Sequence, residues 1–220
     1  MKQIIKLLQF SSYLFPLLVY YLIKKPFWSI IYNTKGNKFS CKAKMIKCQI
    51  YNHGKNNRIE IGTGWIYKTK IHIYGDGNEI ILRNDSRIRD GAFIRVGATG
   101  NKIIIGENFE CSYALITAGD NASIYIGDNC LFSNKIVVRS NDGHEIIDEK
   151  TGQKINPGAD VVIGNHVWIG YGVSILKGST IGNNSIIGTN SMVLGANIPS
   201  GSIAVGTPAK IVKSGVNWRK

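Results

Sequence analysis

A six-residue repeat between residues 162 and 193 constrains the fold of this chain more than any other feature. Isoleucine or valine recurs at every sixth position, and glycine directly follows four of these six positions. The β-branched positions are Ile163, Ile169, Ile175, Ile181, Ile187 and Val193. A period of six matches neither a helix, with 3.6 residues per turn, nor an alternating strand, with a period of two. It indicates a repeat architecture in which each unit packs on the next.

A six-residue unit has room for one short strand and one corner, so three units make a triangular coil of about eighteen residues. We expect the β-branched residues to point into this prism and to stack from coil to coil. Upstream, apolar runs end at Ile61, Leu82, Ile105 and Ile126, at spacings of 21, 23 and 21 residues, which is near one coil each. The 37 residues from Ile126 to Ile163 are interpreted as about two coils.

These spacings predict an all-β parallel β-helix over about residues 46–206. Residues 139–160 are polar and break the period, which predicts a loop extruded from one coil. A basic, apolar N-terminal segment, residues 1–45, is expected to be helical, and residues 207–220 are expected to form a C-terminal tail.

Positive charge is concentrated near the N-terminus. Residues 1–60 hold 11 Lys and Arg and one acidic residue, whereas residues 61–220 hold 16 and 13. The apolar run at residues 7–23 is short for a membrane span. Three possibilities are open for residues 1–31: contact with an anionic membrane surface, a helix packed on the main domain or a neighbouring subunit, and a true span. No nucleic-acid recognition motif accompanies the charge, so no nucleic-acid partner is expected.

The four cysteines form no C-x-x-C pair and have no histidine at metal-ligand spacing. We expect Cys41, Cys48, Cys111 and Cys130 to be free thiols. Free thiols fit a reducing compartment. We therefore expect a cytoplasmic protein, with the N-terminal segment as the candidate contact with the inner face of the cytoplasmic membrane.

The C-terminal half carries signals that are more specific than the period. "RSNDGHEIID" is followed by "INPGADVVIGNHVWIG", and later by "IPSGSIAVGTPAKIV". Over about residues 60–213, and most strongly over 124–213, the chain resembles the hexapeptide-repeat acyltransferases, in particular their polysaccharide O-acetyltransferase branch. The resemblance implies a left-handed β-helix, acetyl-CoA as co-substrate, no metal, and a homotrimer with sites between adjacent subunits.

This resemblance predicts transfer of an acetyl group to a hydroxyl of a bacterial capsular polysaccharide. The basic N-terminal segment favours an anionic polymer. An acetyltransferase for a small acceptor, such as an amino sugar, an antibiotic or a serine-like hydroxyl, is the alternative.

Acyl transfer to a hydroxyl needs a base, and histidine titrates near neutrality. His144 lies in the predicted loop, 24 residues before Trp168, as the family's catalytic histidine precedes its tryptophan. The resemblance therefore implies His144 as general base and Trp168 as a wall of the site against His144 or the sugar. Asp142 and Asp148 are candidates for orienting the imidazole, and Arg139 is a candidate for holding the loop or an anionic sugar.

The resemblance also places the acetyl-CoA contacts. It implies an oxyanion donor at the backbone N–H of Tyr171 and CoA contacts at Tyr171, Thr189, Lys210 and Lys213. The family's usual Thr-Lys pair is absent from "MVLGANIP", so no CoA contact is assigned there.

Two other classes of protein share this kind of fold. A γ-class carbonic anhydrase would need three histidines converging on zinc, and the histidines here are scattered. A nonenzymatic scaffold would explain the hexads but not the interrupting loop. Structural or solvated roles are expected for the remaining histidines: His53, His72 and His166.

Overall fold

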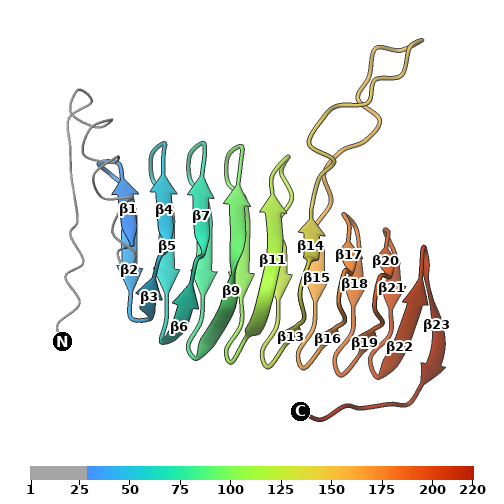
Figure 1. The fold of residues 1–220 in the computed structure, drawn as a ribbon. Helices are drawn as coiled ribbons and strands as arrows, with labels where there is room; N and C mark the ends of the chain where they lie inside the picture. Colours follow the sequence, from blue (N-terminus) through green and yellow to red (C-terminus); the bar gives the residue numbers. More distant parts are fainter. Residues whose placement is uncertain (1–28) are drawn as a thin grey trace.

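The computed structural model describes residues 29–220, which form a parallel β-helix with three faces. Successive coils stack side by side along one axis, and a single long loop projects from the stack (Figure 1). The described residues contain strands and turns but no helix, and so no helix that could cross a membrane. The predicted all-β prism is confirmed.

Strands at equivalent places in successive coils make up the three faces. The first face contains β1 (Ile30–Asn33), β4 (Gln49–Asn52), β7 (Lys70–Ile73), the C-terminal parts of β9 (Ser86–Val96) and β11 (Glu110–Ala118), β14 (Ile136–Arg139), β17 (Ser174–Ile175) and β20 (Met192–Val193). The second face contains β3 (Lys44–Ile46), β6 (Gly64–Tyr67), the N-terminal parts of β9 and β11, β13 (Leu131–Phe132), β16 (Trp168–Ile169), β19 (Ile186–Ile187), β22 (Ser202–Gly206) and β23 (Ala209–Ser214). The third face contains β2 (Lys38–Cys41), β5 (Arg58–Ile61), β8 (Glu79–Leu82), β10 (Lys102–Ile105), β12 (Ile124–Ile126), β15 (Val161–Ile163), β18 (Thr180–Ile181) and β21 (Asn197–Ile198).

The core is a column of β-branched side chains inside the prism. All six repeat positions from Ile163 to Val193 are at most 2% exposed, as predicted. Each strand pairs with its equivalent one coil away, so backbone hydrogen bonding and side-chain stacking are satisfied together. The four cysteines are free, also as predicted.

The interval from Ile126 to Ile163 holds one coil, and the two-coil interpretation is wrong. Ile126 pairs directly with Ile163 in adjacent strands of the third face. The extra length is the loop, which leaves after β14 and returns at β15. Within the loop, Ile155 N donates to Ile146 O at 2.9 Å and Asp148 N to Gln153 O at 2.9 Å. These bonds make the loop a projecting two-armed hairpin, which confirms the predicted extrusion.

The β-helix begins before the predicted N-terminal boundary at residue 46, and its last parallel strand, β22, ends at Gly206. β1, β2 and β3 begin before residue 46, because alternate residues such as Ile31 are buried and pair with the next coil. The described part of segment 1–45 is therefore strand rather than the expected helix. Residues 1–28, with most of the segment considered for membrane contact, lie outside the described residues. At the other end, β23 pairs antiparallel with β22, so residues 207–220 are not a free tail.

Candidate functional site

A cleft of about 330 Å³ lies where the loop joins the first face of the β-helix. Its walls come from the ends of β9 and β11, the end of β14 and both arms of the loop. The charged and titratable residues that line it are Arg95, Asp120, Arg139, Asp142, His144, Glu145 and Lys154. The predicted base and two of its predicted neighbours, Asp142 and Arg139, are thus brought together.

The cleft exists because glycine replaces larger residues at equivalent positions of successive coils. The residues that follow β4 and β7 are His53 and Tyr74, whereas the equivalent residues after β9 and β11 are Gly97 and Gly119. A Cβ on Gly119 would lie 2.9 Å from the Asn141 side-chain nitrogen. Glycine therefore leaves room for the loop and the space in front of it.

Two lysine–aspartate pairs clamp the loop to the coils on either side. Lys154 Nζ lies 2.6 and 2.7 Å from the two carboxylate oxygens of Asp120, which also accepts a hydrogen bond from Gly158 N. Lys177 Nζ, from a later coil, lies 2.6 Å from Asp142 Oδ2 and 3.1 Å from Pro157 O. The loop base is therefore fixed from both sides.

The amide of Asn156 ties the two arms of the loop together beside His144. Its nitrogen donates to Asp142 Oδ2 at 2.8 Å and to His144 O at 2.9 Å, and its oxygen accepts from Ile146 N at 2.7 Å. Hydrogen bonds from Lys177 and then Asn156 are the main reasons why the pKa of Asp142 lies below its usual value. Asp142 is therefore ionised at neutral pH and holds the backbone of His144 through Asn156.

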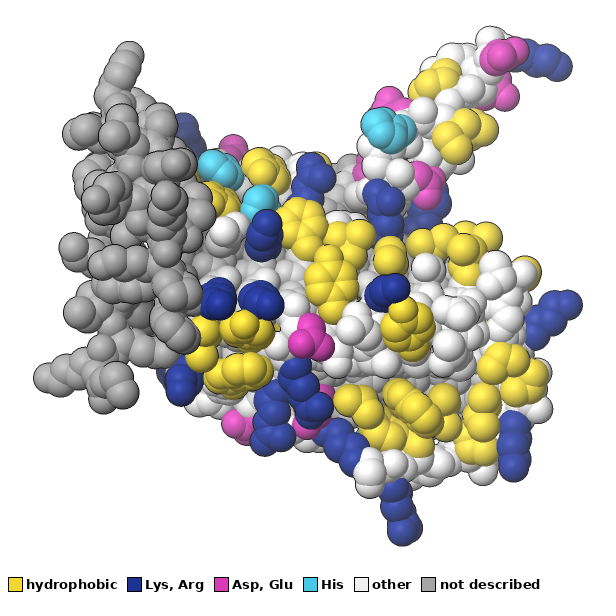
Figure 2. Space-filling view, viewed as in Figure 1, with side chains coloured by type: hydrophobic (Ala, Val, Ile, Leu, Met, Phe, Trp, Pro, Cys, Tyr) yellow, Lys and Arg dark blue, Asp and Glu magenta, His cyan; other side chains and the backbone are white. Residues whose placement is uncertain are grey.

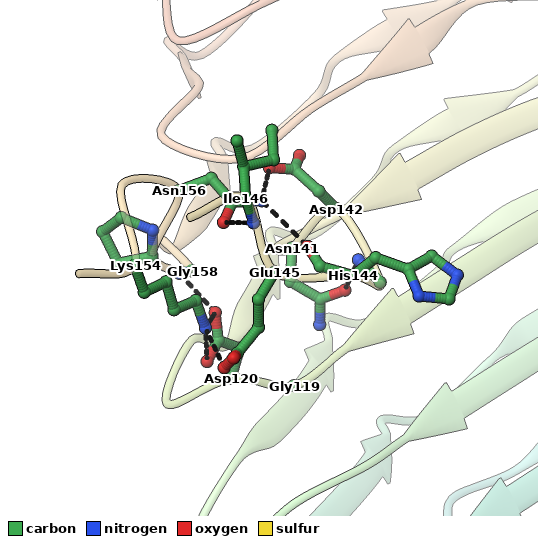
Figure 3. Close-up of polar contacts among 12 residues, drawn as sticks. Gly119, Asp120, Asn141, Asp142, His144, Glu145, Ile146, Lys154, Asn156 and Gly158 are labelled. Atoms are coloured by element: carbon green, nitrogen blue, oxygen red, sulfur yellow. Dashed lines mark hydrogen bonds and ion pairs between the residues drawn. The ribbon is translucent and has the colours of Figure 1, made fainter. Parts of the chain in front are cut away.

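Neither aspartate predicted to orient His144 touches its ring. Asp148 Oδ1 accepts bonds from Lys150 N, Thr151 N and the Thr151 hydroxyl, so it organises the loop tip. Within residues 29–220 the His144 imidazole has no hydrogen-bond partner. Figure 3 shows this ring directed away from Asn156 and from the Asp120–Lys154 pair. The imidazole is exposed and its two nitrogens are available.

Two of the residues that line the cleft are arginines. Arg95 and Arg139 form no ion pair with a carboxylate among the described residues. The Arg139 guanidinium also lies against Gly143, because a Cβ there would be 2.9 Å from its Nη2 atom. Arg139 Nε is buried without a hydrogen-bond partner. Arg95 was not among the site residues predicted from the sequence, although the alternation of β9 would have placed its side chain outside the prism.

The residues predicted to bind CoA lie elsewhere in the same protomer. Trp168, on β16 of the second face, and Tyr171 are each 40% exposed, and neither lines the cleft. Tyr171 and Thr189 occupy equivalent places in successive coils, because Ile169 pairs with Ile187. Lys210 and Lys213 follow on β23, in register with β22 of the next coil. The described part of the chain offers no acceptor for the Tyr171 N–H.

The C-terminal residues cover one side of Trp168, which the sequence did not predict. The Trp218 ring stacks on His166 at 4.2 Å between centroids, and its Nε1 donates to His166 O at 2.8 Å. Trp218 lies 6.1 Å from Trp168. Lys220 then binds the buried carboxylate of Glu110 at 2.6 Å. No periodic signal marks Trp218, because it lies after the last repeat.

The described residues contain no group of three or more His, Cys, Asp or Glu side chains placed to hold a metal ion. His144 lies on the loop, whereas His166 stacks under Trp218 on another face.

Comparison with known proteins agrees with this geometry. Residues 160–195 match the family model described as bacterial transferase hexapeptide (six repeats). The polysialic acid O-acetyltransferase of Neisseria meningitidis is 33% identical over 187 residues, which covers 75% of this chain and 86% of that protein. The polysialic acid O-acetyltransferase of Escherichia coli O1:K1 / APEC is 39% identical over 57% of this chain, but the match spans 40% of that protein's length.

Among solved structures, that of the polysialic acid O-acetyltransferase OatWY matches with a TM-score of 0.75 and 28% identity, over 84% of this chain and 87% of that one. The β-helix is left-handed, as the sequence resemblance implied. With a third of positions identical over most of both chains, this protein belongs to the left-handed β-helix, hexapeptide-repeat acetyltransferases, in the branch that contains the capsular polysaccharide O-acetyltransferases.

Proposed function

We propose that this enzyme transfers the acetyl group of acetyl-CoA to a hydroxyl of an anionic capsular polysaccharide, with His144 as general base. The observation that carries the proposal is the cleft, which is lined by the exposed His144 and by two arginines that form no ion pair with a carboxylate within residues 29–220. The two bacterial relatives are named for acetylation of polysialic acid, a polymer of acidic sugars.

The chemistry follows from the availability of the His144 ring. The imidazole accepts the proton of the acceptor hydroxyl as its oxygen attacks the thioester carbonyl carbon. The tetrahedral oxyanion then collapses, the carbon–sulfur bond breaks, and the CoA sulfur takes the proton back from His144. The Tyr171 N–H has no protein acceptor within residues 29–220, which supports its proposed role as the oxyanion donor.

The acceptor is proposed to be anionic because of the unpaired arginines. Asp120 pairs with Lys154 and Asp142 with Lys177, and Glu145 lies 3.5 Å from the same Lys154. The cleft therefore keeps an excess of positive charge, and Arg95 and Arg139 form no ion pair within residues 29–220. Guanidinium groups bind carboxylates with paired hydrogen bonds, which fits an acidic sugar.

The complete site is proposed to form between copies of a homotrimer. His144 and the Trp168–Tyr171 region lie on different faces of one protomer, so a single chain does not bring them together. The projecting loop carries three exposed isoleucines: Ile146 at 55%, Ile147 at 46% and Ile155 at 58%. Exposed apolar groups on a projecting arm favour contact with a neighbouring copy. Such contact would set His144 against the CoA groove of the next subunit.

We further propose that the reaction takes place in the cytoplasm, where acetyl-CoA is available, and that residues 1–31 bring the enzyme to the inner membrane surface. The excess of basic residues in this part of the sequence supports the second statement.

The test is acetyl-CoA-dependent ester formation on a panel of acceptors: polysialic acid, another anionic capsular polymer, a neutral polymer and small hydroxyl compounds. We expect acetyl esters and CoA release with an anionic polymer. CoA release can be followed with a thiol reagent, because burial raises the pKa of all four cysteine thiols, to about 12 for Cys111 and about 11 for Cys130, which lowers their reactivity. A reaction without acceptor corrects for the partly buried Cys41. Esters on small compounds alone would contradict the proposal and favour the small-acceptor alternative.

A further inference from the structure

A ladder of outward-facing side chains runs along the first face from the cleft towards the N-terminal coils. Its members lie in register on neighbouring strands, one per coil: Tyr32, Tyr51, His72, Arg95, Thr117 and Arg139. Residues on either side of each member along the strand point into the core, as with Ile71 and Ile73 beside His72. The β-helix thus repeats one surface position at the coil spacing of about 4.8 Å, which makes the ladder roughly 24 Å long.

Rings in the ladder are packed against a second column, formed by His53 and Tyr74. Tyr51 meets His72 edge-on at 4.9 Å between centroids, and His53 stacks on Tyr74 at 5.3 Å. Arg95 lies 5.4 Å from the Tyr74 ring and joins the aromatic part to the cleft. Tyr74 is 40% exposed, and Tyr51, His53 and His72 are half-buried. The rings hold one another in place, so little side-chain entropy is lost when a ligand binds.

The strand segments on this stretch of the first face carry positive charges and no negative ones. From β1 to β14, the charged residues of the first-face strand segments are Lys70, Arg95 and Arg139. Figure 2 shows histidine, lysine and arginine side chains gathered with hydrophobic side chains along the edge from which the loop projects. Flat rings alternating with cations suit a ligand that has apolar ring faces and acidic groups.

The ladder is also continuous with the cleft. Arg95 and Arg139 belong to both, and Thr117 lines the cleft between them. A chain whose reacting unit lies at His144 would therefore leave the cleft over Arg95 and Tyr74.

We infer that this ladder is an acceptor-binding track, on which several sugar units of an anionic polysaccharide lie while one unit reacts at His144. The inference rests on the proposed function and deepens it, since it says where the units of the polymer that do not react are bound. Sugar rings present C–H faces that pack on aromatic rings, and their acidic groups meet Lys70, Arg95 and Arg139. One coil advances by about the length of one sugar ring, so a single repeat can serve successive units.

The test compares acceptor length dependence in the full-length enzyme. kcat and KM are measured with fragments of one anionic polymer, from two sugar units to more than ten, for wild type, Tyr51→Ala and Tyr74→Ala. Neither tyrosine contacts the loop or His144 in the structure. The matched control is Tyr67→Ala, which removes an aromatic residue stacked on Trp65 of the second face. Thermal unfolding of each variant and its KM for acetyl-CoA check that folding and the donor site are retained.

We expect KM to fall with acceptor length in wild type and in Tyr67→Ala. Each ladder variant should raise KM for long acceptors by roughly three- to tenfold and leave values for the shortest acceptor unchanged. Equal KM for short and long acceptors in wild type would overturn the track while leaving the acetyltransferase assignment intact. Ladder variants whose KM still falls with acceptor length as in wild type would also overturn the track. Failure to acetylate any polymer would instead contradict the proposed function. Should Tyr51→Ala fold poorly, Lys70→Ala gives a second test, because it keeps the rings and removes one positive charge of the track, and it should likewise raise KM for long acceptors only.

Discussion

At the residue scale, the position of His144 depends on Asn156, whose amide, in the returning arm of the loop, binds three groups in the outgoing arm. Asp142 was predicted to orient the imidazole directly, and the structure instead shows it bound to Lys177 and Asn156. The pKa of Asp142 is lowered in the folded protein, so its bonds contribute above its unfolded pKa and are lost as pH falls through the folded pKa. The clamp is therefore complete at neutral pH.

Replacing Asn156 with alanine should release His144 without unfolding the protein. Asn156 lies in the loop, outside the stacked coils, so we expect little change in the melting temperature. We expect kcat to fall on the order of tenfold, because a misplaced base loses its alignment with the hydroxyl. Steady-state kinetics and thermal unfolding test this, with Thr151→Ala at the loop tip as control. An unchanged kcat in Asn156→Ala would show that the amide does not position His144.

The sequence could single out His144 as the candidate base but not the residues around it. His144 was identified from its 24-residue spacing to Trp168, which matches the family's pattern. This spacing can be read from the sequence without knowledge of how the chain packs. Asn156 and Lys177 carry no such signal, because the loop arms and the next coil meet only in three dimensions. The alternation of inward and outward residues in β9 could have predicted that Arg95 points outward. It could not have predicted the cleft beside Arg95, which depends on Gly97 and Gly119.

At the element scale, a buried amide ladder joins the N-terminal coils, where the hexad period is loose. Asn78 N donates to Asn57 Oδ1 at 2.8 Å, and Asn101 N donates to Asn78 Oδ1 at 2.8 Å. The Asn78 side-chain nitrogen donates to Tyr74 O and Ala98 O, and Asn78 is fully buried. These amides satisfy corner backbone groups that the longer coils leave open.

The change Asn78→Ala should destabilise the protein by about 2–4 kcal/mol, because it leaves buried donors and acceptors without partners. Urea unfolding of Asn78→Ala and of the exposed-site control Lys55→Ala gives the difference. A free energy of unfolding equal to wild type would mean that water replaces the amide at this corner.

The strands themselves were predictable where the period is strict and less so elsewhere. Between Ile163 and Val193 the side-chain pattern sets inward and outward positions directly. Around β1 to β3 the coils are longer and the apolar signal is confined to residues such as Ile31, so the start of the β-helix was placed too late. The number of coils between Ile126 and Ile163 was overestimated, because the loop is about as long as one coil.

At the scale of the whole molecule, the proposed base and the proposed acetyl-CoA contacts lie on different faces of the protomer. The clamped His144 loop projects from the first face, and Trp168, Tyr171 and Thr189 line the corner of the second. The proposed trimer joins the loop of one copy to the groove of the next. An active site shared between copies has a consequence that can be measured by mixing inactive chains.

The most direct measurement is acetyl ester formation by His144→Ala, by Trp168→Ala and by trimers assembled from both chains together, with Lys150→Ala as the loop control. His144→Ala alone should lose about 10²- to 10⁴-fold in kcat, the usual contribution of a general base. When the two chains are mixed in equal amounts and assemble at random, about a quarter of the shared sites combine an intact His144 from one chain with an intact Trp168 from its neighbour. About a quarter of wild-type activity should therefore return. Full activity in His144→Ala, or a mixture as inactive as either variant alone, would contradict a base that acts across the subunit boundary.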